Sequence, residues 1–329
     1  MIDFRYHLVS IIAVFLALAV GLLVGATALS GKDEEALKTA QTALSHANDA
    51  LSKANRALTQ QVSNDQAFAQ VVSPSLLHGL LPGENAVLIV APGANSQVTS
   101  GVTTALRRAG ATVTGQVQLT TQFMDPTGSN EAQLRQLAQS LADEAGVTLP
   151  AQSASSALTG QQDAALVLAA SVVTNDGAGL STGASQAVLN GFVQDGFVNS
   201  LTAPAPAELA VLVTPSGPPP ASGSDGQVLA IVAQELHAAS SATVMAGDVS
   251  SIGSGSAIDV EDNAGPLVST VDNADTETGQ IMVVFALVLA LEHKAPAAYG
   301  IGPAAVPSPV PTPSASPSAS TTPTAGGHK

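Results

Sequence analysis

Residues 179–183, Gly-Leu-Ser-Thr-Gly, match the Gly-x-Ser-x-Gly pattern of a serine nucleophile. Such a nucleophile needs a strand that leads straight into the serine and a helix that leads out of it. Residues 175–178, Asn-Asp-Gly-Ala, stand where that strand should end. Asp225 and His237 follow in a suitable chain order, but no pattern singles them out. We therefore predict a Gly-rich loop that caps the next helix, and not a hydrolase.

Acidic residues near the end of the chain are a second candidate for chemistry. Asp259, Glu261, Asp262, Asp272 and Asp275 could hold a hard cation or act as general acids and bases. Their spacing is not that of an EF-hand. A solvated surface that forms turns is the more economical interpretation.

Soft metal ligands are scarce in this sequence. There is no cysteine, which excludes disulfides and thiolate sites, and no two Met or His residues form a copper-binding pair in the sequence. Met245 and Met282 could still meet in the fold, so the metal stays unknown. The loop at 91–95 has neither a dinucleotide fingerprint nor a phosphate-binding lysine, and we expect no cofactor and no enzyme.

Charge excludes one class of partner. The formal net charge is −15, and no Lys or Arg occurs between Arg135 and Lys294. A nucleic-acid-binding surface needs clustered basic residues. We therefore predict no nucleic-acid partner.

Apolar runs alternate with helical patterns between residues 84 and 300. This alternation predicts an α/β fold with a mostly parallel sheet covered on both faces. Residues 86–119 and 208–246 would be two similar strand–helix–strand units. The expected strands are 86–90, 111–119, 208–213, 242–245 and 267–271. The expected helices are 97–109, 131–145, 161–173, 184–194, 227–239 and 276–291.

The uncharged run from Leu8 to Leu29 is long enough to cross a membrane, since a helix of this length spans about 33 Å. Residues 26–28, Ala-Thr-Ala, would suit a signal peptidase, but the run is longer than the apolar region of a signal peptide. We favour an uncleaved anchor. Arg5 on one side and Lys32 and Lys38 on the other leave its orientation undecided.

Small residues recur at every fourth position of this run. Such a stripe lets two helices approach closely in lipid, and it ends in a Gly-x-x-x-Gly motif. We predict that it pairs helices. The stripe consists of Ala13, Ala17, Gly21 and Gly25.

Leucines recur at every seventh position beyond residues 30–31, Ser-Gly, where we expect the helix to break. With Leu at position a of a heptad, Ala occupies position d, and the pattern holds until Gln61 and Asp65 weaken it. It predicts a coiled coil with a second copy or with another envelope protein. One amphipathic helix lying on its own domain is the alternative. The seam residues are Leu37, Leu44, Leu51, Leu58, Ala40, Ala47 and Ala54.

Two stretches resemble the actinobacterial copper transport protein B family. Residues 1–10, Met-Ile-Asp-Phe-Arg-Tyr-His-Leu-Val-Ser, with the apolar run at 13–21, match its N-terminus. Residues 268–275, Val-Ser-Thr-Val-Asp-Asn-Ala-Asp, match its C-terminal signature together with two later glycines and a tyrosine. The signature residues are Asp272, Asn273, Asp275, Gly279, Tyr299 and Gly300.

This resemblance implies a single-pass protein of the cell membrane, with its head outside the cytoplasm and a role in copper efflux or homeostasis. Relatives that resemble regulators of cell-wall hydrolases suggest an alternative, a non-enzymatic scaffold acting through its coil. The expected organisation is an anchor at 1–30, a coiled coil at 31–73, an α/β head at 84–300 and a disordered Pro/Ser/Thr-rich tail at 301–329.

Overall fold

The computed structural model describes residues 4–150, 158–175, 177, 179–200, 204–217 and 224–306. The chain divides into two compact units, Met1–Asp65 and Gln66–Lys329. The first unit is helical throughout its described part, and the second contains the α/β head. The four segments expected from the sequence, with their boundaries, stay predictions.

The helix α1, Phe4–Leu77, is continuous and corrects the expected break at residues 30–31. A single glycine costs a helix only about 1 kcal/mol relative to alanine, and helix-favouring residues surround this one. Pro74 also lies inside α1. It stands in the last turn, where only one backbone hydrogen bond is lost and the helix is about to end.

The head is built on a mostly parallel sheet, which confirms the predicted fold class. Its order is β3-β2-β1-β4-β5-β6-β7, and only β3 runs antiparallel to its neighbour in the described part. The strands β2 and β3 lie on one side of β1, whereas β4 and the later strands lie on the other, so the order of strand addition reverses between β1 and β4. The strands are β1 Asn85–Val90, β2 Thr112–Leu119, β3 Val198–Ser200, β4 Leu209–Val213, β5 Ala242–Ala246, β6 Ser269–Val271 and β7 Ala298–Tyr299.

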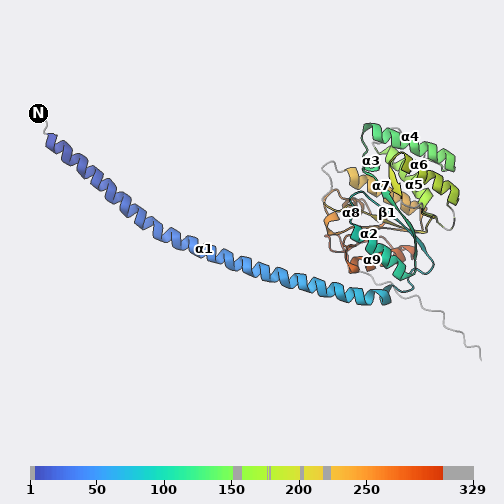
Figure 1. The fold of residues 1–329 in the computed structure, drawn as a ribbon, viewed down its shortest axis with the longest axis horizontal. Coiled ribbons are helices and arrows are strands. Elements are labelled where there is room, and N and C mark those ends of the chain that lie inside the picture. Colours follow the sequence, from blue (N-terminus) through green and yellow to red (C-terminus); the bar gives the residue numbers. More distant parts are fainter. Residues whose placement is uncertain are drawn as a thin grey trace, which may run out of the picture. The chain divides into compact units, whose positions relative to one another are not determined.

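Helices cover both faces of the sheet (Figure 1). Val87 and Ile89 of β1 face one core, while Leu88 and Val90 face the other, so the strand is buried on both sides. The first core packs against α4, α5, α6 and α7, and the second against α2 and α9. The helices are α2 Ser96–Ala109, α3 Thr121–Met124, α4 Gly128–Ala145, α5 Thr159–Val172, α6 Thr182–Gln194, α7 Ser224–Ala239, α8 Ala257–Asn263 and α9 Glu277–Leu291, with a 3-10 turn η1 at Val249–Ser251.

Residues 301–306, at the start of the predicted tail, form hydrogen bonds with the head. The Gly302 amide donates to Asp272, and the Val306 amide donates to the Ala298 carbonyl. The rest of the predicted tail, residues 307–329, lies outside the described part of the chain, so the disordered tail at 301–329 stays a prediction.

Candidate functional site

The point where the sheet order reverses, between β1 and β4, is where open α/β folds bind ligands. The loops after these strands meet there, because the Ser216 amide donates to the Gly93 carbonyl and Ala94 bridges to Pro215. A cavity of about 200 Å³ lies beside them, with Asp225 and several hydroxyl groups in its wall. The expected loop at 91–95 is thus at the carboxyl edge of the sheet, with Asn95 capping α2.

Asp248, two residues after β5, links the loops at this edge by hydrogen bonds. Its carboxylate accepts hydrogen bonds from the Asn95 side chain at 3.0 Å, from Ser216 at 2.6 Å and from the Ser250 amide at 2.9 Å. Burial alone would raise the pKa of Asp248, but these hydrogen bonds outweigh it and lower the pKa. No sequence pattern singled out this residue; an acidic side chain two residues beyond a buried strand was the available signal.

Of the five acidic residues proposed as a cation or acid–base site, three line a common pocket. Asp259, Asp262 and Asp272 line a pocket of about 280 Å³. Burial, with the neighbouring carboxylates, raises the pKa of Asp262. Burial, together with the nearby Asp248, raises the pKa of Asp275.

Each carboxylate of this pocket already has protein donors. Asp259 accepts from the Gly255 amide at 2.9 Å, and Asp262 accepts from the Thr270 hydroxyl at 2.7 Å. Asp272 accepts from two backbone amides. Within the described residues, no group of three or more His, Asp or Glu side chains has the arrangement of a metal site.

The signature residues come from the turn after β6, from α9 and from the end of β7, and several of them meet at the end of β6. Gly300 has φ 129°, and a Cβ there would lie 1.9 Å from Oδ1 of Asp272. A Cβ on Gly279 would lie 2.0 Å from the Asn273 carbonyl oxygen. Tyr299 is buried in the core beneath α9. The geometry gives these residues a structural role that the sequence pattern alone did not reveal.

The Gly-x-Ser-x-Gly motif does not form a nucleophile elbow. Ser181 is the N-cap of α6, and its hydroxyl accepts from the Ala184 amide at 3.3 Å, as a capping loop requires. Asp225 and His237 lie in the first and last turns of α7. Twelve residues of helix separate them by about 18 Å, so they cannot act on one serine together.

The internal methionines are core residues. Met124 is 3% exposed, Met245 0% and Met282 6%. Thioethers packed among aliphatic side chains fill space more often than they bind metal. The burial of the three side chains therefore agrees with a packing role.

The segment Tyr6–Ala26 of α1 is the one helix of the described chain that is long and apolar enough to cross a membrane. Its 21 residues span about 31 Å as a helix. Ala13, Ala17, Gly21 and Gly25 are exposed at intervals of four residues, and a Cβ on either glycine would meet no atom within 4 Å. The small-residue stripe is free to contact another helix.

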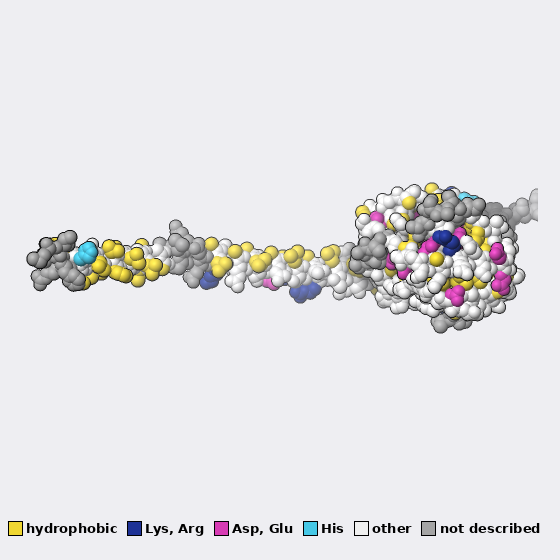
Figure 2. Space-filling view, turned by 90° about the horizontal axis from the view of Figure 1, so that it is seen from above, with side chains coloured by type: hydrophobic (Ala, Val, Ile, Leu, Met, Phe, Trp, Pro, Cys, Tyr) yellow, Lys and Arg dark blue, Asp and Glu magenta, His cyan; other side chains and the backbone are white. Residues whose placement is uncertain are grey.

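The predicted seam residues of α1 are exposed as well. Leu37 is 70% exposed, Leu44 71%, Leu51 70% and Leu58 60%. Ala40, Ala47 and Ala54 are also exposed. Hydrophobic side chains crowd the apolar segment in Figure 2 and continue as a row along one side of the following helix. The heptads thus lie on a helix, as expected, while their partner is still a prediction.

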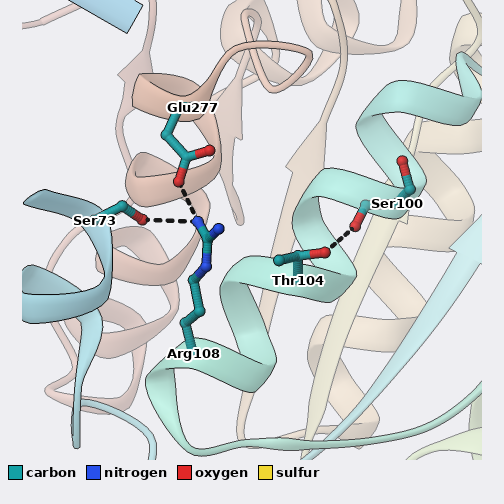
Figure 3. Close-up of polar contacts among 5 residues, drawn as sticks. All are labelled: Ser73, Ser100, Thr104, Arg108 and Glu277. Atoms are coloured by element: carbon teal, nitrogen blue, oxygen red, sulfur yellow. Dashed lines mark hydrogen bonds and ion pairs between the residues drawn. The ribbon is translucent and has the colours of Figure 1, made fainter. Parts of the chain in front are cut away.

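The last turns of α1 are fastened to the head by Arg108, in the last turn of α2 (Figure 3). Its guanidinium donates to the hydroxyl of the buried Ser73 at 3.2 Å and pairs with Glu277 in the first turn of α9. A cation at the C-terminal end of α2 and an anion at the N-terminal end of α9 also interact favourably with the dipoles of these two helices. No sequence pattern indicated these contacts, although Arg108 and Glu277 stand at the ends of two expected helices, 97–109 and 276–291.

Known proteins similar to this chain share nearly its whole length. The model of the family described as copper transport outer membrane protein, MctB, matches residues 1–310. Copper transporter MctB of Mycobacterium leprae is 31% identical over 312 residues, which cover 92% of this chain and 97% of the relative. Copper transporter MctB of Mycobacterium tuberculosis H37Rv is 28% identical over 313 residues, 93% of this chain and 98% of the relative.

Proposed function

The chain belongs to the MctB family of copper transport outer membrane proteins, and from this premise we propose that it acts in copper efflux or homeostasis as a paired, single-pass membrane protein. The family and the apolar helix together indicate membrane association. We place the head outside the cytoplasm and assign it no enzymatic activity. Copper is the cargo of the assembly in this proposal.

The exposed leucine seam is the observation that supports pairing most directly. Burying one leucine side chain is worth about 1.5–3 kcal/mol, and here four remain 60–71% exposed at every seventh position. A strict seven-residue repeat favours a left-handed supercoil with a second helix. The small residues around Gly21 and Gly25 extend the same preference into the membrane.

A copper path across the membrane would also call for assembly. One apolar helix satisfies its backbone hydrogen bonds within itself, but it has no interior space for an aqueous path. A copper path across the membrane would have to come from several chains or from another protein. The chain would then contribute an anchor, a coil and a rigid head.

Reporter fusions test whether the head lies outside the cytoplasm. A reporter that works only outside the cytoplasm should be active when it is fused after Ser30 and after Gly302. A reporter that works only in the cytoplasm, active at both positions, would place the head inside the cell and overturn the assignment.

Pairing is tested on residues 31–302 produced without the membrane segment. Leu44→Asp combined with Leu51→Asp should convert a dimer into a monomer, because each buried leucine lost from such a seam costs about 2–5 kcal/mol. Ser45→Asp with Ser52→Asp adds the same charge one position away from the seam and should leave the dimer intact. Sedimentation of the unaltered protein as a monomer at tens of micromolar would rule out self-pairing in water.

A further inference from the structure

A second apolar patch lies on the head-proximal turns of α1. Phe68 is 69% exposed and Val71 is 78% exposed, although both stand beside the folded head. Ala69, Ser73 and Leu77 of the same turns are buried, at 8%, 0% and 0% exposure. The head therefore covers one face of this helix end and leaves an aromatic and a valine in water on another.

The patch continues the leucine repeat in sequence. Counting by sevens from Leu58 gives Asp65 and then Val72 at position a, while Phe68 falls at position d. Val71 occupies position g, where alanines stand in the leucine heptads. The repeat is therefore interrupted by two successive polar positions, Gln61 at d and Asp65 at a, and does not end there.

The covered face and the exposed patch point in different directions. At about 100° per residue, Ala69, Ser73 and Leu77 centre roughly 140° away from the face formed by the exposed Phe68 and Val71 and the half-buried Val72. A second helix lying on the patch would therefore not displace the head. In a parallel pair the two heads would lie on the outer sides.

We propose that the patch of Phe68, Val71 and Val72 is occupied by the same patch of a second copy, in a parallel and in-register pair that extends to the head. This inference rests on the pairing proposed above and adds its extent and register. Nothing charged stands at the flanking positions e and g of the leucine heptads to repel an identical helix or to select a different one. These positions hold Gln41, Asn48, Asn55, Ala43, Ala50 and Ala57.

Asp65 gives this pair its specificity. In register, the two Asp65 carboxylates face each other at position a, where like charges weaken pairing. A polar residue at one a position commonly fixes register at a cost in stability. The Asp65 layer would keep the pair reversible and align Phe68 with its counterpart.

Cysteine cross-linking of the full chain in membrane vesicles tests the extent of the pair, since the chain has no native cysteine. Under mild oxidation, Val72→Cys should form a disulfide-linked dimer. The exposed Gln70→Cys, at position f, should stay monomeric. Leu44→Cys reports the leucine heptads separately.

Three outcomes decide between the proposals. Cross-linking at residues 44 and 72 but not at 70 supports the extended pair. Cross-linking at 44 alone retains the proposed pairing and overturns its extension to the head. Cross-linking at neither position, or equally at 70 and 72, overturns the in-register pair with a second copy.

Substitutions on the full chain in detergent supply an independent measurement. Phe68→Ala should weaken dimerisation by about tenfold or more, and Asp65→Asn should tighten it several-fold. Gln70→Ala should change it little. If Asp65→Asn leaves the affinity unchanged and Phe68→Ala does the same, the patch is not part of the interface.

Discussion

Met245 and Met282 lie in cores on opposite faces of the central sheet. Met245 points from β5 into the core beneath α5 and α7, whereas Met282 of α9 belongs to the core on the other side. The sequence left open that these two thioethers could meet. The sheet separates them, so they cannot bind one copper ion together.

We therefore expect no tight Cu(I) site in the head. Tight binding needs two or more soft ligands within about 2–2.5 Å of the metal. Residues 31–302 titrated with Cu(I) against a competing chelator should fail to hold the ion at sub-nanomolar affinity. Stoichiometric binding that is lost on Met245→Leu or Met282→Leu would contradict this expectation.

The contacts of Arg108 with Ser73 and Glu277 should stabilise the head. Arg108→Ala leaves Glu277, whose side chain is only 10% exposed, without its cation. We expect the free energy of unfolding to fall by about 2 kcal/mol, as for a hydrogen bond to a charged group. Urea unfolding of residues 31–302 followed by circular dichroism measures this change.

Arg107→Ala, one residue earlier on the exposed surface, is the matched control for these contacts and should change stability by no more than about 0.5 kcal/mol. Equal losses in the two variants would show that the ion pair contributes nothing specific. Non-additive losses for Arg108→Ala and Glu277→Gln would confirm the coupling.

The ionised carboxylate of Asp262 should lower the free energy of unfolding of the head at neutral pH, compared with a neutral side chain at this position. Burial and the neighbouring carboxylates raise its pKa in the folded state above the usual 3.8. A carboxyl with a raised folded pKa costs stability once it ionises, and the cost vanishes below its unfolded pKa. Asp262→Asn, which keeps an oxygen acceptor for Thr270, should raise the free energy of unfolding at pH 7.

The gain from Asp262→Asn should shrink as the pH falls toward 3.8. Asp143→Asn, at an exposed position of α4, should show little of this dependence. A gain that is the same at every pH, or a loss at pH 7, would mean that the ionised carboxylate is not the source of the cost.

Gly300 should tolerate no side chain. Its φ of 129° is unfavourable for other residues, and a methyl group would collide with Asp272. Gly300→Ala should lower the melting temperature of residues 31–302, with a loss of roughly 2 kcal/mol or more. Gly183→Ala, in α6 with no atom within 4 Å of its Cβ, should be neutral or mildly stabilising. The opposite order of the two variants would contradict this account.

Most helices and strands of the head were determined by the sequence itself. Gly110 and Gly146, which directly follow the expected helices 97–109 and 131–145, end α2 and α4 in the left-handed conformation. The strands β1, β4 and β5 stand within two residues of their expected ends. These signals are local, because periodicity and capping act over a few neighbouring residues.

Short elements and side-chain partners were decided only by the tertiary structure. The strands β3 and β7 have three and two residues, too few for a period to appear, and exist because a neighbouring strand pairs with them. The network of Asp248 joins residues up to 153 positions apart.

Which residues and helices lie on each face of the sheet could not be predicted from the sequence either. Neighbouring residues of a strand point to opposite faces of the sheet, and the side chain of Met245 points to one face. The helix α9, with Met282, packs on the opposite face. The sequence determined which segments are apolar and periodic, since that is a property of neighbouring residues. The fold alone decided which of those segments meet, because strand order and packing depend on contacts distant in sequence.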